Sequence, residues 1–218
     1  MSEGLEEHIK SERRDFQNEA LEEASMQENP MAQFKLWLAE AIDNKVQEPY
    51  AMCISTIGQD GFPSSRMVFF REMDDEGLIF YTNYKSRKGQ ELEQNSKAVV
   101  NFHWELMDRQ VNMKGEVHKV SNEQSDAYFN SRPRESQIGA WASDQSQVLG
   151  DRTELEARIK ALSERFEGKE VSRPEHWGGY VIRAKEWEFW QGRSSRLHDR
   201  IRYRKDEKGN WQKERLNP

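Results

Sequence analysis

The chain has 218 residues, which suits one domain with an appendage. Its net charge of -6 argues against a general nucleic-acid-binding protein, and its aromatic content of 11% is too high for a disordered chain. Cys53 is the only cysteine, which excludes an intramolecular disulfide and a multi-cysteine metal site.

No apolar run approaches the length needed to span a membrane. The N-terminal residues lack a basic region followed by an apolar stretch, so no secretory signal is expected. These features predict a cytoplasmic protein without a membrane partner.

The first 29 residues are rich in Glu and poor in large apolar side chains, which predicts a flexible or partly helical arm. Asn29 and Pro30 then predict a helix start, because Asn caps well and Pro fits the first turn. The residues that follow at helical spacing predict one buried face: Phe34, Trp37, Leu38, Ala41 and Ile42. We therefore predict an arm over 1–29 and a single domain over 30–218.

From residue 50 the hydrophobic periodicity becomes that of strands. The predicted strands are 50–57, 63–73, 78–83, 97–105, 109–120, 179–190, 197–205 and 210–215, with Asp- and Gly-rich turns at 58–61 and 74–77. Helices are predicted at 86–94, 121–131 and 151–166. Consecutive strands with short turns are typical of an antiparallel barrel. The predicted fold class is α+β, mainly β with flanking helices.

The motifs of several common enzyme classes are absent from the sequence. It has no Gly-rich dinucleotide fingerprint, no P-loop and no Gly-x-Ser-x-Gly elbow. Its five histidines are scattered without the spacing of zinc ligands, so no metal site is predicted. A phosphate ligand would therefore be held by side chains.

Four segments combine cations with aromatic or hydroxyl side chains, at 65–71, 81–88, 128–141 and 187–200. Aromatic walls with convergent cations suit a flat, anionic ligand. For each segment alone, surface charge is the favoured interpretation. His198 alone fits a surface residue paired with Asp199, and the aromatic residues before it fit the core.

Two of these segments read Ser131-Arg-Pro-Arg-Glu-Ser-Gln-Ile-Gly-Ala-Trp141 and Glu188-Phe-Trp-Gln-Gly-x3-Arg-Leu-His-Asp-Arg200. They resemble signatures of the pyridoxine/pyridoxamine 5'-phosphate oxidase family. Further matches follow the family order: Arg66-Met-Val, Tyr81-Thr-Asn, Ser86-Arg-Lys, Arg109-Gln-Val and Glu214-Arg-Leu-Asn-Pro. The resemblance runs from about residue 30 to the last residue. It implies an FMN-binding split β-barrel and a homodimer with FMN at the interface.

The resemblance also implies a cofactor site and a substrate site. The residues implied to bind FMN are Arg66, Met67, Val68, Phe69, Phe70, Arg71, Tyr81, Thr82, Arg87, Lys88, Gln110, Gln145, Ser146, Trp190 and Arg200. Those implied to bind substrate are Arg71, Tyr128, Arg132, Ser136, Arg196, Leu197 and His198. Arg196 and His198 are implied to lie against the pyridine ring and to act in catalysis.

The implied reaction is a hydride transfer from C4' of pyridoxine or pyridoxamine 5'-phosphate to N5 of FMN. Oxygen then reoxidises the flavin and yields hydrogen peroxide, and the amine substrate also releases ammonia. A split-barrel flavin reductase, a non-catalytic flavin- or B6-binding protein and a nucleic-acid-binding barrel remain alternatives. The loop 196–198, together with Arg132 and Ser136, favours the oxidase. A protein that only binds flavin would not need these substrate-binding residues.

Two positions depart from the family pattern. The family usually has Lys where this chain has Arg71, which keeps the charge but changes its reach and geometry. Arg13 and Phe16 match a segment that in relatives closes over the substrate and carries Tyr, so Phe16 lacks that hydroxyl.

Overall fold

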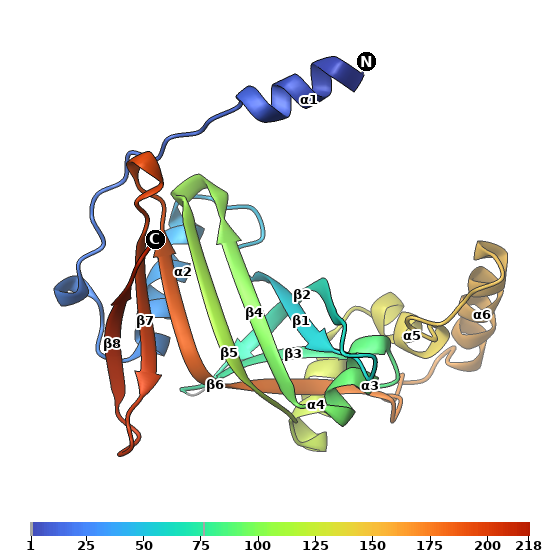
Figure 1. Cartoon of the computed structure of the whole chain (residues 1–218). Coiled ribbons are helices and arrows are strands. Elements are labelled where there is room, and N and C mark those ends of the chain that lie inside the picture. Colours follow the sequence, from blue (N-terminus) through green and yellow to red (C-terminus); the bar gives the residue numbers. More distant parts are fainter. Residues whose placement is uncertain (1, 76) are drawn as a thin grey trace. The chain divides into compact units, whose positions relative to one another are not determined.

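The structure is a computed structural model that describes residues 2–75 and 77–218. Met1 and Glu76, which fall in the predicted arm and in the predicted turn at 74–77, lie outside the described residues. The strands form one sheet in the order β3-β2-β1-β4-β5-β6-β7-β8, and β3 also pairs with β6. This second pairing closes β1 to β6 into an antiparallel barrel, so the predicted fold class is confirmed (Figure 1).

All eight predicted strands are present, each within two residues of its expected ends. Their bounds are β1 Ala51–Ile57, β2 Pro63–Met73, β3 Gly77–Asn83, β4 Lys97–Trp104, β5 Arg109–Lys119, β6 Trp177–Gln191, β7 Asp199–Lys205 and β8 Trp211–Leu216. β1 pairs with β2 over its full length, and β3 pairs with β6 from Gly77 opposite Arg183 to Asn83 opposite Trp177.

The α-helices are α1 Ser2–Ser11, α2 Pro30–Asp43, α3 Arg87–Gln94, α4 Asn122–Ser131, α5 Arg134–Ala142 and α6 Arg152–Arg165. Short 3-10 helices span Glu23–Ser25, Glu105–Met107 and Ser194–Arg196. The starts of α2, α3, α4 and α6 are capped by side chains that accept backbone N–H groups: Asn29, Ser86, Ser121 and Asp151. Two of these four starts, at Asn29 and Ser121, were predicted as capped from the sequence. Ser86 and Asp151 are the first residues of their predicted helix ranges.

α5 has no counterpart among the helices predicted from the sequence, where residues 132–137 were interpreted as a loop between aromatic residues. Pro133 precedes this helix and offers no side-chain cap, so the polar signal of a helix start is missing. The helix is stabilised instead by burial of Ile138, Ala140 and Ala142. A second correction concerns Ile42, which is 56% exposed although we expected it in the buried face of α2.

The chain divides into two compact units. The terminal unit comprises residues 2–47, His103–Val111 and Trp187–Pro218, and the central unit comprises 48–75, 77–102 and Asn112–Glu186. β4, β5 and β6 contribute residues to both units. The predicted boundary between an arm and a domain at residue 30 stays a prediction.

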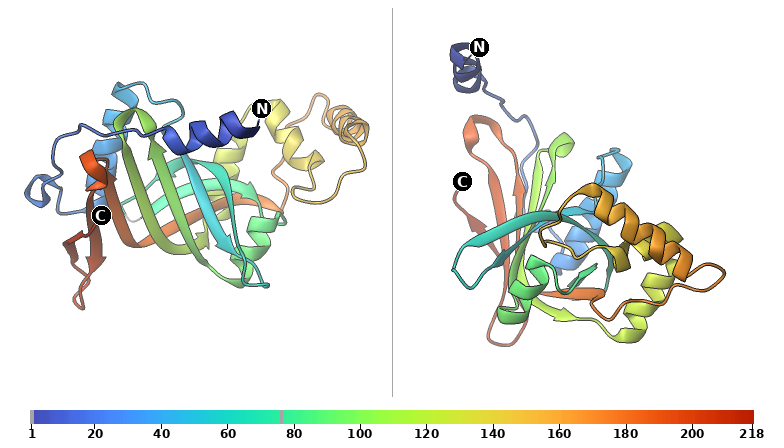
Figure 2. Two further views of the ribbon diagram at one scale, coloured as in Figure 1. Left: turned by 45° about the horizontal axis from the view of Figure 1, so that its top comes forward. Right: turned by 90° about the vertical axis from the view of Figure 1, so that its right-hand side faces the viewer.

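The terminal unit has an aromatic core between α2 and its strands. The rings of Phe34 and Trp187 lie 5.4 Å apart, and those of Trp37 and Phe189 lie 5.2 Å apart. Tyr203 of β7 packs edge-on against Phe189 at 5.5 Å. The segment after α1 is extended and passes the loop between β6 and β7 before it descends beside β8 (Figures 1 and 2).

The central unit holds the interior of the barrel. Its fully buried apolar side chains come from several strands and include Met52, Ile54, Leu78, Phe80, Val100, Phe102, Met113 and Ile182. A second cluster lies among α4, α5, α6 and the start of β6, with Phe129, Ile138, Phe166 and Trp177 buried together. No helix within the described ranges is long and apolar enough to cross a membrane. The cytoplasmic location stays a prediction.

Gly115→Ala tests the close approach of β5 to β6. A Cβ atom at residue 115 would lie 2.4 Å from the carbonyl oxygen of Arg183, so the backbone must shift. We expect a loss of about 1–3 kcal/mol in the free energy of unfolding, measured by urea denaturation. Gly4→Ala is the control, since no atom lies within 4 Å of its added Cβ. Equal stability of the two variants would contradict this packing.

Candidate functional site

A cleft of about 850 Å³ lies in the central unit and gathers most of the predicted site residues. Its lining includes Arg66, Met67, Val68, Phe69, Arg71, Tyr81, Thr82, Arg87, Lys88, Tyr128, Arg132, Ser136, Gln145 and Ser146. These residues come from β2, β3, α3, α4, the α4–α5 junction, α5 and the segment after α5. The volume is within the usual range for small-molecule sites. The structure therefore brings together predicted site residues that lie up to 80 positions apart in the chain.

A buried carboxylate, Glu91 of α3, binds two of the arginines of this cleft. Its oxygens accept hydrogen bonds from the hydroxyls of Thr56 at 2.5 Å and Ser64 at 2.7 Å. The guanidinium nitrogens of Arg66 and Arg87 lie 3.2 Å and 2.8 Å from the carboxylate. Burial raises the pKa of Glu91, but these donors outweigh it and hold the pKa at about 2. Glu91 thus fixes both arginines as cations at the cleft.

Lys88 is a buried cation in the same cleft, with 7% of its surface exposed. Its Nζ atom lies 3.2 Å from Thr82 Oγ1, 3.1 Å from Gln145 Oε1 and 3.3 Å from Ser86 Oγ. Burial, followed by the nearby charge of Arg66, lowers the pKa of Lys88 to about 8. Because these three hydrogen-bond partners are neutral oxygens, an anionic ligand would stabilise the charged form of the lysine.

Arg132 presents an unsatisfied guanidinium group to the cleft. Its Nη1 atom is buried and has no hydrogen-bond partner among the residues that the structure describes. The guanidinium carbon lies 4.6 Å from the centre of the Trp177 ring, and burial lowers the pKa of Arg132. An unpaired buried donor costs about 1–3 kcal/mol, and more when it is charged. Arg132 is therefore suited to bind an anionic group that enters the cleft.

Three parallel aromatic rings form a wall of the cleft. The rings of Tyr81 and Tyr128 stack at 3.8 Å with an angle of 7° between their planes. Trp177 lies 6.3 Å from Tyr128, again at 7°. The N-terminus of α5 also meets the cleft, where Pro133 and Ser136 line it. Helix N-termini favour anions, which adds to the cationic character of the site.

Two residues of the β2 segment behave differently from their neighbours. The side chain of Phe70 is 5% exposed and packs edge-on against Phe102, so it belongs to the core. Arg71 is exposed, and its guanidinium lies over the rings of Phe69 at 4.9 Å and Tyr50 at 5.3 Å. Its role with cofactor and substrate stays a prediction.

The remaining predicted site residues lie in the terminal unit: Gln110, Trp190, Arg196, Leu197, His198 and Arg200. The rings of Trp190 and His198 lie 4.6 Å apart, and Phe16 packs edge-on against both, at 6.0 Å and 5.6 Å. His198 Nδ1 accepts a hydrogen bond from the backbone N–H of Arg193 at 3.1 Å. The neutral ring therefore carries its proton on Nε2.

The alternative in which His198 pairs with Asp199 is wrong for this structure. Asp199 accepts hydrogen bonds from the Arg215 guanidinium at 2.7 Å and from the backbone N–H of Leu21 at 3.0 Å. Trp187 and Phe189 are buried in the core, as the sequence analysis allowed for these aromatic residues. Trp190, in contrast, is only half-buried.

The loop that carries Arg196 has an unusual backbone. Ser195 and Arg196 have φ angles of 56° and 60°, a left-handed conformation that residues other than Gly adopt rarely. The carboxylate of Asp15 accepts the backbone N–H of Ser195 at 2.9 Å. Asn18 adds hydrogen bonds to the carbonyl of Gly192 and to Asp108, both at 3.0 Å. Contacts from residues 15–18 therefore hold this strained loop.

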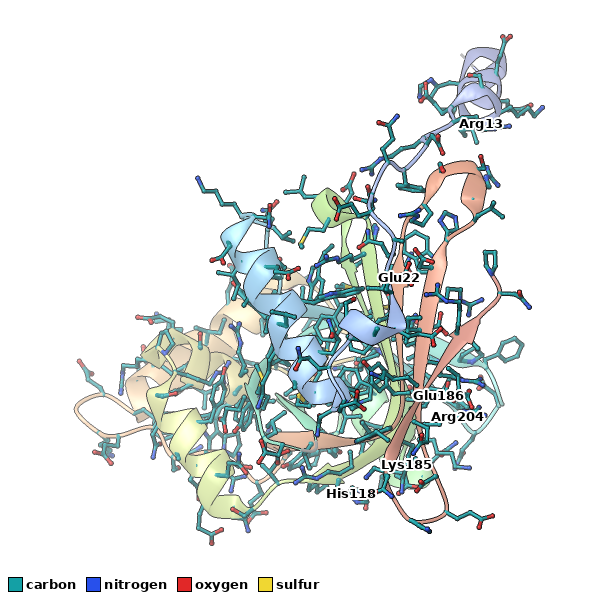
Figure 3. All side chains as sticks on the ribbon, turned by 90° about the vertical axis from the view of Figure 1, so that its left-hand side faces the viewer. Arg13, Glu22, His118, Lys185, Glu186 and Arg204 are labelled. Atoms are coloured by element: carbon teal, nitrogen blue, oxygen red, sulfur yellow. The ribbon has the colours of Figure 1, made fainter. Side chains whose placement is uncertain are left out.

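Arg200 is held by Glu188 through two hydrogen bonds of 2.8 Å and 3.1 Å. The hydrogen bond to Glu188 raises the pKa of Arg200 above its ordinary value. Gln110 is half-buried at the start of β5. Arg13 is exposed, follows α1 and donates to the backbone carbonyl of Glu12 (Figure 3).

Sequence reasoning missed the carboxylates and amides that hold the site. Glu91, Glu188, Asp15 and Asn18 each bind a predicted site residue or its loop. Glu188 was part of a recognised signature, and Glu91 lies four residues after Arg87, a spacing that favours an ion pair on a helix. No local pattern marks Asp15 or Asn18, because their partners in this loop are more than 170 residues away.

The fold and the cleft define a class: an antiparallel six-stranded barrel with a cationic, aromatic-walled site for an anionic ligand. Comparison with known proteins narrows this class. Residues 38–166 match the family described as pyridoxamine 5'-phosphate oxidase, and residues 177–218 match the pyridoxine 5'-phosphate oxidase C-terminal dimerisation region.

Individual relatives agree with this match. A pyridoxine/pyridoxamine 5'-phosphate oxidase of Acaryochloris marina is 49% identical over 206 residues, which cover 94% of each chain. That of Gloeothece citriformis is 46% identical, with 98% of this chain and 100% of the relative covered. The crystal structure of PhzG from Burkholderia lata 383, in complex with tetrahydrophenazine-1-carboxylic acid, is 33% identical with a TM-score of 0.85. It covers 92% of this chain and 98% of its own.

The chain belongs to the pyridoxamine 5'-phosphate oxidase family and is an enzyme of that family. Family membership supports FMN as its cofactor. The cleft fits such a group, since it combines buried cations, hydroxyls and stacked aromatic rings. Among the described residues no group of three or more His, Cys, Asp or Glu side chains could hold a metal ion.

Glu91→Gln tests the buried carboxylate through the pH dependence of stability. The folded pKa of about 2 lies below the ordinary value of 4.5, so the charge of Glu91 stabilises the fold above pH 4.5. This contribution is lost as the pH falls from 4.5 towards 2. We expect wild type to be more stable than the variant at pH 7, with the difference shrinking through this window. Urea unfolding at several pH values measures it, and a constant difference would contradict the assigned pKa.

Proposed function

We propose that the chain is an FMN-dependent oxidase that converts pyridoxine or pyridoxamine 5'-phosphate to pyridoxal 5'-phosphate. Oxygen is the electron acceptor, hydrogen peroxide is released, and the amine substrate also yields ammonia. The relatives that share 46–49% of their residues with this chain carry the name of this activity. The predicted vitamin B6 metabolism and the absence of a nucleic-acid partner follow from the same proposal.

The observation that carries the proposal is the buried guanidinium of Arg132. It has an unpaired Nη1 atom, and it lies above Trp177 at the wall formed by Tyr128. A substrate with a phosphate group and a flat pyridine ring satisfies both features at once: guanidinium groups bind phosphate, and rings stack. Ser136 in the first turn of α5 adds a hydroxyl donor for the same phosphate.

The other cations of the cleft suit the phosphate of FMN. Arg66 and Arg87 are fixed by Glu91, and Lys88 lies beside the hydroxyl of Thr82. Bound there, FMN would supply the redox chemistry, an oxidation of the substrate at C4' with oxygen as the final electron acceptor. The protein supplies binding, orientation and the electrostatic environment.

We propose that Arg196 and His198 orient the pyridine ring and handle protons, with Trp190 and Arg200 completing the flavin site. The Nε2–H of neutral His198 is a donor, and its ring is fixed by Trp190 and Phe16. The match of residues 177–218 to a dimerisation region supports a homodimer. In the proposal FMN binds at the interface of that homodimer.

The visible spectrum of the purified protein, followed by oxygen uptake, tests the function. We expect a yellow protein, or one that becomes yellow when FMN is added. Oxygen uptake should occur with pyridoxamine 5'-phosphate and be strongly reduced with unphosphorylated pyridoxamine, because Arg132 then lacks its anion. A protein that cannot be loaded with FMN, or that shows no uptake with the phosphorylated substrates, would falsify the proposal.

The affinity for FMN should fall as the pH rises through 8. Lys88 has a pKa of about 8, so it is charged and binds a phosphate below that value but loses its charge above it. Fluorescence titration with FMN between pH 6.5 and 9.5 measures the dissociation constant. Lys88→Met should bind FMN more weakly and with a flatter pH profile. An identical profile for the two proteins would remove Lys88 from the site.

Arg196→Ala should impair turnover more than it impairs FMN retention. The side chain is exposed on the loop after β6 and lies outside the lining of the cleft in the central unit. We expect kcat/KM for pyridoxamine 5'-phosphate to fall at least about 100-fold, a loss of about 2.7 kcal/mol in transition-state stabilisation, with an unchanged flavin spectrum. Arg193→Ala is unsuitable as a control because Arg193 binds Asn18. Arg152→Ala serves instead, because its exposed side chain pairs with Glu156 on α6, away from this loop in the chain. Unchanged turnover would remove Arg196 from the mechanism.

A further inference from the structure

Glu72 of β2 joins two elements beside the cleft without lining it. One carboxylate oxygen accepts a hydrogen bond from the Tyr81 hydroxyl of β3 at 2.6 Å, and the other accepts one from the Gln124 side chain of α4 at 2.8 Å. A register shift between Phe70 and Glu72 marks an irregularity in the pairing of β2 with β3 at this point. Short bonds to a carboxylate are stronger than bonds between neutral groups.

The bond to Glu72 determines what the Tyr81 hydroxyl can do. Burial, followed by this hydrogen bond, raises the pKa of Tyr81, so its hydroxyl stays protonated and donates its single proton to Glu72. That proton is then not available to a phosphate in the cleft. The contribution of Tyr81 to the site is therefore its ring.

The ring of Tyr81 is nearly parallel to both other rings of the wall, and one of these, Trp177, lies against Arg132. The Tyr81 ring lies 3.8 Å from Tyr128 and 5.7 Å from Trp177, with its plane turned by 7° and 13°. The Arg132 guanidinium lies 4.6 Å from the centre of the Trp177 ring. A tyrosine that lost its acceptor would leave a half-buried hydroxyl unsatisfied and would turn towards another partner.

We propose that Glu72 is a positioning residue for substrate recognition: by holding the Tyr81 hydroxyl it fixes the aromatic stack that supports Arg132. This inference rests on the proposed function, because it takes Arg132 and Tyr128 as the substrate-binding residues. Glu72 acts through Tyr81 and touches neither substrate nor cofactor. It sets the affinity for the phosphorylated substrate and leaves the chemical step unchanged.

Steady-state kinetics with pyridoxamine 5'-phosphate test the proposal. Glu72→Ala should raise KM about 10-fold, with kcat and the flavin spectrum within twofold of wild type. Glu72→Gln should stay within about threefold in KM, since its amide oxygen accepts the same hydrogen bond. Glu156→Ala, which removes an exposed carboxylate paired with Arg152 on α6, controls for the change in net charge and should match wild type.

A double-mutant cycle separates positioning from a general structural role. Tyr81→Phe removes the same hydrogen bond from the other side, so the double variant Glu72→Ala/Tyr81→Phe should be no worse than Glu72→Ala alone. Additive effects of the two changes would overturn the proposal. So would a wild-type KM in Glu72→Ala, or an equal loss of affinity in Glu72→Gln.

Equilibrium binding distinguishes this inference from the proposed function. Titration with pyridoxal 5'-phosphate, followed by absorbance, needs no turnover and should show the same 10-fold weakening in Glu72→Ala. A wild-type protein that binds this ligand but consumes no oxygen would contradict the oxidase proposal alone. Equal binding by wild type and Glu72→Ala would contradict the role of Glu72 alone.

Discussion

The cleft of the central unit depends on the buried carboxylate of Glu91, which binds arginines from two separate elements, β2 and α3. Glu91 is only 5% exposed, yet it remains charged because two hydroxyls and two arginines donate to it. It joins α3 to β1 and β2, where Thr56 and Ser64 lie opposite each other. Without this charge, Arg66 and Lys88 would repel each other with no counterion inside the protein. The same arrangement leaves the outward side of the cations open to an anionic ligand.

Much of the fold could be predicted because strand periodicity is a local property. The spacing of apolar residues predicted every strand to within two residues of its ends, and Asp- and Gly-rich turns separated the first three strands. The helix starts at Asn29 and Ser121 could be predicted because a capping side chain acts within three residues. α5 lacked such a cap and was missed. Ile42 fits the period of α2, but its exposure depends on what covers the end of that helix.

The cations and aromatic rings of the candidate site could be predicted from the sequence. The carboxylates that bind and orient them could not. Arg66, Lys88, Arg132 and Trp190 lie in dense clusters that the sequence displays directly. The partner of a carboxylate depends on tertiary structure, so Glu72 and Asp15 carried no local signal. For the same reason His198 seemed a candidate partner of Asp199, whereas Arg215 and Leu21 occupy that carboxylate.

The extended segment between α1 and α2 is bound to the terminal unit at several points. Phe16 covers His198, the Arg215 guanidinium donates to Glu23 and to the Leu21 carbonyl, and Glu22 lies beside the same hairpin (Figure 3). None of the residues that line the cleft of the central unit precedes Arg66. Limited proteolysis within this segment would therefore remove contacts from the loop after β6 without cutting the chain at any residue that lines the cleft of the central unit.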